Sequence, residues 1–139
     1  MKDPRKRAVL DTNVLVSALI NPYGAPGRIW DLVIHQQLVL GYDDRILVEY
    51  QQVLRRGKFG FDPDSVDAIL AIFQFQESVY PLRWNLSGIP DQTDLMFLEV
   101  ASAAGCPLIS GNLKHYPESI RGTVSVLSPK DYLDGTGSQ

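Results

Sequence analysis

The stretch Ala8-Val9-Leu10-Asp11-Thr12-Asn13-Val14-Leu15-Val16, AVLDTNVLV, changes character twice. An apolar run typical of a short buried strand leads into three polar residues, and an apolar run typical of a buried helix follows. We predict a strand over Arg7–Leu10 and a helix over Asn13–Ile20. Asp11 therefore stands between a buried strand and a buried helix, at the carboxyl end of the strand.

The alternation of strands and helices continues along the chain. Further strands are predicted at Leu38–Tyr42, Val79–Leu82, Leu108–Ser110 and Val124–Leu127, and further helices at Pro26–Gln36, Asp44–Arg56, Pro63–Phe75 and Gln92–Ala104, with a short terminal helix from Ser128. Short apolar strands that alternate with helices are typical of a parallel sheet covered on both faces. The expected fold class is α/β, with three α/β/α layers. In such sheets ligands bind outside the carboxyl ends of the strands, where Asp11 lies.

Size and composition fit one domain. The chain has 139 residues, of which 45% are hydrophobic and 21% charged, and residues 134–139 are expected to form a disordered tail. We find no signal peptide pattern and no run apolar enough to span a bilayer. The single cysteine, Cys106, is expected to be a small buried hydrophobe, and a cytoplasmic location is expected.

The charge pattern allows two interpretations. The net charge of −3 is unlike that of a typical nucleic-acid binder, but basic residues cluster at Lys2–Arg7 and at Arg55–Lys58. Such clusters are either solvated ends of elements or groups that bind phosphate.

Asp11 and Glu49 each have a structural and a functional interpretation. Asp11 could cap the helix that follows it, since Asp, Thr and Asn all favour that position. Glu49 shares a helical face with the apolar residues Ile46 and Val53. It therefore either reaches out to solvent at the rim of this face or is paired with a cation.

Two further acids begin the predicted helix Gln92–Ala104. Asp91 and Asp94 would both be stabilised by the positive end of the helix dipole, and simple capping explains Asp91 better than Asp94. Asn112 follows a strand end as part of Gly111-Asn112, which is also ordinary turn chemistry.

These side chains could converge at one edge of the sheet. Three close carboxylates would repel one another, and a hard divalent cation would remove the repulsion. Oxygen ligands without His or Cys suit Mg²⁺ or Mn²⁺ rather than zinc. His115 is expected to be a structural part of the turn KHYP.

Four motifs resemble those of PIN-domain ribonucleases over about Arg7–Leu133, namely VLDTNVLVSAL, LVEYQQVLRR, DQTDLMFLEVASAAG and LISGN. The chain is similar in particular to toxin components of bacterial toxin–antitoxin pairs. The resemblance implies that the catalytic and metal-binding acids are Asp11, Glu49 and Asp94, with Asp91 an accessory acid and Asn112 at the position of an often acidic fourth ligand. Thr12, Asn13 and Ser110 would orient the carboxylates.

The resemblance implies a Mg²⁺- or Mn²⁺-dependent endoribonuclease that hydrolyses RNA phosphodiester bonds. Its expected partners are RNA, a cognate antitoxin protein and a second copy of the chain. The residues expected to contact RNA are Arg7, Arg55, Arg56, Lys58 and Lys114.

Two other functions were considered. An aspartyl-phosphate phosphatase of the haloacid-dehalogenase type is disfavoured, because it needs a second Asp two residues after the first and this chain has Asn13 there. A PIN domain that binds RNA or a partner without cutting is compatible with Asn112, because Asn offers an oxygen but no charge.

Overall fold

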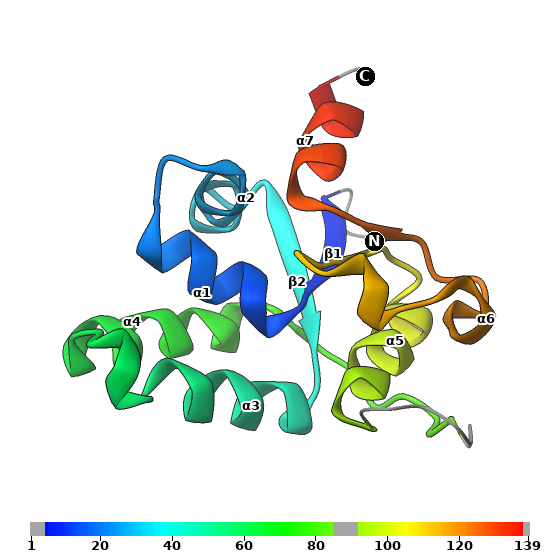
Figure 1. The fold of residues 1–139 in the computed structure, drawn as a ribbon, viewed down its shortest axis with the longest axis horizontal. Coiled ribbons are helices and arrows are strands. Elements are labelled where there is room, and N and C mark those ends of the chain that lie inside the picture. The colour runs from blue at the N-terminus through cyan, green and yellow to red at the C-terminus, as the bar shows by residue number, and fades with distance from the viewer. Residues whose placement is uncertain (1–4, 85–91, 138–139) are drawn as a thin grey trace.

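Five parallel strands form the central sheet in the computed structural model, which describes residues 5–84 and 92–137 (Figure 1). The strands are β1 (Lys6–Leu10), β2 (Leu38–Tyr42), β3 (Glu77–Ser78), β4 (Leu108–Ile109) and β5 (Val126–Leu127). Their order in the sheet is β3-β2-β1-β4-β5, and every pairing is parallel. The strand that precedes Asp11 is therefore the central one.

Helices cover both faces of this sheet. Within the described residues they are α1 (Thr12–Ile20), α2 (Ala25–Ile34), α3 (Asp44–Leu54), α4 (Pro63–Ile72), α5 (Gln92–Ala104), α6 (Glu118–Arg121) and α7 (Pro129–Gly137). Figure 1 shows α1 and α2 on one side of the sheet and α5 on the other. The expected three-layer α/β/α fold with a parallel sheet is confirmed.

The core forms where the apolar faces of these elements meet the sheet. Ala8, Val9 and Leu10 of β1 are buried, because this central strand is covered on both faces. The apolar stripe of α4 and the turn after it is also part of the core, since Val66, Ile69 and Phe73 are buried and Leu70 is partly buried. Trp30 of α2 packs on Phe73, with ring centroids 6.4 Å apart.

The prediction for the third strand was wrong in position. The strand is β3, Glu77–Ser78, paired with Gly41 and Tyr42, and not Val79–Leu82. Polar groups fix this register, because Gln76 accepts a hydrogen bond from the Leu40 amide at 2.9 Å and Glu77 pairs with Arg7 at 2.5 Å. The apolar run that follows is not buried as a strand would be.

The prediction of a disordered tail from residue 134 was wrong for residues 134–137. Helix α7 continues to Gly137, and residues 138–139 lie outside the described part. The helix is anchored by Tyr132, which is buried, and its first turn is closed by the Ser128 hydroxyl, which accepts a bond from the Asp131 amide.

Three helices end earlier than predicted. Helix α4 ends at Ile72, and the chain continues as a 3₁₀ turn over Phe73–Phe75. Helix α2 ends at Ile34, and Gln36 then adopts a left-handed conformation with φ of 62°, which a helix cannot continue through. Helix α3 ends at Leu54, with Arg55 as its C-cap. No helix among the described residues is long and apolar enough to cross a membrane.

Candidate functional site

Asp11 occupies the N-cap position of α1 but does not cap it with its side chain. The Asp11 backbone carbonyl accepts the bond from the Val14 amide, at 2.9 Å. The Oδ2 atom of Asp11 instead accepts hydrogen bonds from the Ser110 hydroxyl at 2.8 Å and from the Tyr116 hydroxyl at 2.9 Å. Ordinary capping therefore does not explain this carboxylate, which is only 6% exposed.

The Oδ1 atom of Asp11 accepts no hydrogen bond from any described residue, and no described cationic side chain pairs with this carboxylate. Because both donors to Oδ2 are fully buried, they fix the direction in which the second oxygen points. Oδ1 is thus the oxygen of Asp11 that the described residues leave without a donor.

Glu49 lies beside this group on α3. It is half-buried, and its Oε2 atom accepts a hydrogen bond from the buried hydroxyl of Thr12 at 3.0 Å. Thr12 directly follows Asp11, so the two carboxylates are held at the same carboxyl end of β1. No described cation pairs with Glu49 either.

Tyr50 lies in the negative electrostatic field of this region. Its buried hydroxyl donates to the Leu10 carbonyl at 2.5 Å. Burial, followed by the charges of Asp11, Glu49 and Asp43, raises the pKa of Tyr50 well above its ordinary value. The phenol therefore stays protonated and acts as a neutral donor that fixes the end of β1.

The segment after β4 is connected to the same site. Gly111 donates its amide to Asn13 Oδ1 at 3.0 Å, and Asn112 donates its amide to the Ser110 hydroxyl at 3.0 Å. The Asn112 side-chain nitrogen lies 2.9 Å from His115 Nε2. Asn13 and Ser110 thus hold this turn in place, and His115 has a structural contact with Asn112.

The remaining acids of the predicted site lie on or before α5. Asp91 lies outside the described residues. Asp94 lies in the first turn of α5, whose backbone is described, whereas the Asp94 side chain is not. Among the side chains that are described, no group of three His, Cys, Asp or Glu residues could hold a metal ion.

A second buried acidic cluster was missed by our sequence analysis. Arg45 binds Asp43 Oδ2 at 2.7 Å and Glu99 Oε1 at 2.7 Å, and both carboxylates are buried. Asp43 also caps α3 through the Ile46 amide, and Glu99 accepts a bond from the Trp84 amide. The available signal was Glu99 itself, a carboxylate within the apolar helix α5.

Arg45 supplies one positive charge that both carboxylates of this second cluster share. Burial lowers the pKa of Arg45, but the hydrogen bonds to Asp43 and Glu99 outweigh burial and raise the pKa above its ordinary value. The guanidinium therefore stays charged at every physiological pH, and it joins α3 to α5.

A hollow of about 540 Å³ lies at the opposite edge of the sheet, lined by residues that include Lys6, Cys106 and Tyr132. Burial, followed by the charge of Glu77, raises the pKa of Cys106 to about 12. The thiol is therefore protonated and a poor nucleophile, in keeping with its predicted structural role.

The basic residues predicted to contact RNA differ in their surroundings. Arg7 pairs with Glu77, and Arg55 pairs with Asp67 at 2.5 Å. Arg56 and Lys58 are exposed and form no ion pair within the described chain, and Lys114 is exposed in the short 3₁₀ turn after Asn112.

Comparison with known proteins agrees with this geometry. Residues 7–114 match the PIN domain family, so the chain belongs to the PIN domain family. PIN domains are generally nucleases and typically use divalent metal ions. An uncharacterized protein of Methanocaldococcus jannaschii is 31% identical over 117 residues, which cover 81% of this chain and 74% of the relative.

Proposed function

We propose that the protein is a metal-dependent endoribonuclease that hydrolyses RNA phosphodiester bonds. The observation that carries this proposal is the pair Asp11 and Glu49, two carboxylates held at the carboxyl edge of the sheet with no described cation beside them. Burying such charges is costly unless a counterion is supplied, and a divalent cation would supply it.

The donor set fits a hard cation. The oxygens of Asp11 Oδ1 and the Glu49 carboxylate suit Mg²⁺ or Mn²⁺, and we propose Asp94 as the third acid and Asp91 as an accessory acid. Asn112 would contribute its Oδ1 atom, because its nitrogen is engaged with His115. Such a cation lowers the pKa of water and stabilises charge on the phosphate.

The surrounding residues would prepare this site. Ser110 and Tyr116 hold Asp11 so that Oδ1 is free, and Thr12 holds Glu49. The donors are themselves buried, so the carboxylates need not reorganise when a ligand binds.

A role as the toxin of a toxin–antitoxin pair is the more specific part of the proposal. It is supported by the resemblance of the motifs to that branch of PIN-domain proteins, and it includes a homodimer, an antitoxin partner and a cytoplasmic location. The neighbouring gene tests it: a small open reading frame with a DNA-binding pattern is expected, whose product binds this protein and suppresses cleavage.

A second candidate function is a PIN domain that binds RNA without cutting it. Asn112 favours this alternative, since it replaces a charged ligand with a neutral one. The two functions are separated by incubating the protein with a labelled single-stranded RNA.

The expected result is internal cleavage in Mg²⁺ or Mn²⁺ and none in EDTA. Binding without cleavage in both metals would favour the second candidate. Cleavage that persists in EDTA would rule out the metal-dependent mechanism.

A further inference from the structure

Arg56 lies two residues beyond the end of α3, the helix that carries Glu49. Leu54, the last residue of that helix, is five positions after Glu49, or roughly 7–8 Å along the helix axis. The Arg56 amide donates to the Val53 carbonyl at 3.1 Å, and the Arg56 backbone is extended, with φ of −64° and ψ of 132°. Arg55, the C-cap residue of α3, pairs with Asp67 of α4.

Arg56 and Lys58 are available to an outside anion. Neither forms an ion pair within the described chain, and both are exposed. Two carboxylates on the following segment are already engaged, because Asp67 binds Arg55 and Asp62 caps α4 through the Ser65 amide.

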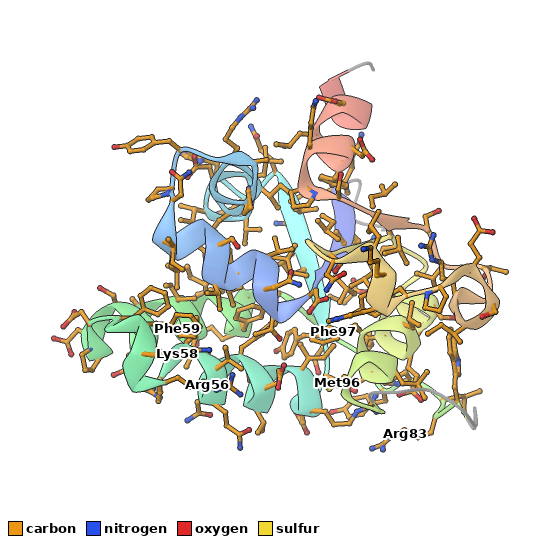
Figure 2. The ribbon with its side chains drawn as sticks, viewed as in Figure 1. Arg56, Lys58, Phe59, Arg83, Met96 and Phe97 are labelled. Carbon is orange, nitrogen blue, oxygen red and sulfur yellow. The ribbon has the colours of Figure 1, made fainter. Side chains whose placement is uncertain are left out.

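An aromatic pair adjoins these cations. Phe59 and Phe61 stack with ring centroids 5.4 Å apart and an interplanar angle of 11°, and Lys58 Nζ lies 5.1 Å from the Phe59 ring centroid. Both rings are only half-buried. Figure 2 shows Arg56, Lys58 and Phe59 gathered at the end of α3 and the turn that follows it.

Basic side chains beside half-exposed aromatic rings are the usual means of holding single-stranded nucleic acid. The cations take phosphates and the rings take bases, without a need for a particular sequence. Because this group directly follows the end of α3, the helix that carries Glu49, a strand held there would pass the proposed catalytic carboxylates within a few nucleotides.

We infer that the end of α3 binds the flanking part of a single-stranded RNA substrate, with phosphates on Arg56 and Lys58 and a base stacked on Phe59. This inference rests on the proposed function for the identity of the substrate. It adds the location of the RNA on the protein surface. It also predicts that Arg56 contributes more to RNA binding than its neighbour Arg55.

The test measures RNA binding separately from cleavage. All variants are made in the Asp11→Asn background, and binding of a fluorescent single-stranded oligoribonucleotide is followed by anisotropy over a range of salt concentrations. Arg56→Gln is expected to weaken binding about three- to tenfold at roughly 0.1 M salt and to lower the salt slope by about 0.7. Arg55→Gln should weaken RNA binding less, because the Arg55 guanidinium is already paired with Asp67.

The matched control is Arg28→Gln, which removes the same charge from an exposed arginine of α2 and should leave the salt slope unchanged. Equal losses from Arg28→Gln, Arg55→Gln and Arg56→Gln would overturn the inference, because binding would then depend only on net charge.

The aromatic part is tested by Phe59→Leu, for which we expect a loss of about tenfold. Phe59→Tyr should retain binding, and this variant controls for loss of packing. Phe75→Leu makes the same change at an exposed phenylalanine near the amino end of β2 and should have no effect. Full binding by Phe59→Leu would overturn the stacking contact.

The two proposals fail in different ways. If the protein with native Asp11 cleaves no RNA but Arg56→Gln still weakens binding, the proposed catalysis is wrong and the binding surface stands. If cleavage occurs and Arg56→Gln and Phe59→Leu leave both cleavage and binding unchanged, the RNA lies elsewhere on the protein.

Discussion

Two acidic clusters of this protein differ in one component. Asp43 and Glu99 share Arg45, which binds both carboxylates at 2.7 Å. Among the described residues, Asp11 and Glu49 have only hydroxyl donors, from Ser110, Tyr116 and Thr12. One cluster therefore holds a cation of its own, whereas the described residues give the other cluster none.

We propose that this difference separates a structural role from a functional one. A buried carboxylate can be stabilised by a fixed guanidinium, and the result is a rigid link between two helices. A carboxylate that is oriented only by neutral hydroxyls keeps its charge available for a cation that binds reversibly. Each of the following predictions tests this contrast.

The largest effect is expected for Asp11→Asn. The loss of a residue that only hydrogen-bonds a metal ligand lowers activity roughly 10–100-fold. For Asp11→Asn we expect the rate of RNA cleavage to fall by more than that. The midpoint of thermal unfolding should stay the same or rise, since an unpaired negative charge is removed. Retained cleavage with a lowered midpoint would reverse the assignment and make Asp11 structural.

Arg45→Met should mainly affect stability. It leaves Asp43 and Glu99 buried without a counterion, and we expect a loss of about 3 kcal/mol in the free energy of unfolding, measured in urea. This is the low end for a buried pair, because Arg45 itself is 27% exposed.

The control for that variant is the triple change Asp43→Asn, Arg45→Met and Glu99→Gln. It removes the charges of the cluster together and should recover part of the lost stability. If Arg45→Met alone lowers the free energy of unfolding no more than a surface substitution does, Arg45 does not stabilise the cluster.

Tyr116→Phe should weaken the proposed metal site without unfolding the protein. The change deletes one of the two hydroxyls that hold Asp11 Oδ2, and we expect about a tenfold loss of Mn²⁺ affinity by isothermal titration. Tyr132→Phe is the control, since it makes the same change at a buried tyrosine of α7. Unchanged affinity in Tyr116→Phe would mean that Ser110 alone orients the carboxylate.

The smallest effect is expected for Asn112→Asp. An added negative charge should tighten Mn²⁺ binding a few-fold and lower the Mn²⁺ concentration needed for half-maximal cleavage. Affinity that falls instead would indicate that Asn112 serves the contact with His115 and takes no part in metal binding.

Local patterns in the sequence were sufficient for the layers of the fold and for the place of Asp11. The apolar strands, the helix stripes and the polar stretch after β1 are signals that adjacent residues carry. The cap at Asp43 could be predicted for the same reason, because its partner Ile46 is three residues away.

Contacts between distant residues could not be predicted in this way. The register of β3 depends on Gln76 reaching Leu40, and the second cluster depends on Arg45 meeting Glu99, 54 residues later. The role of Tyr116 was also missed, because nothing in the turn KHYP indicates a hydroxyl directed at Asp11. Side-chain partners across the sheet depend on packing that a single sequence does not specify.

The distance along the chain between Asp11 and the residues that hold it has a consequence for biosynthesis. Ser110 and Tyr116 follow Asp11 by 99 and 105 positions, and β1 pairs with β4 only after all the intervening elements have been made. Translation adds about 5–20 residues per second, so Asp11 exists for several seconds without its hydroxyl partners. A nascent chain therefore cannot hold the Asp11 carboxylate in place until Tyr116 has left the ribosome exit tunnel. For a protein proposed to cut RNA, this order of events delays assembly of the site until Tyr116 has been made and has left the ribosome.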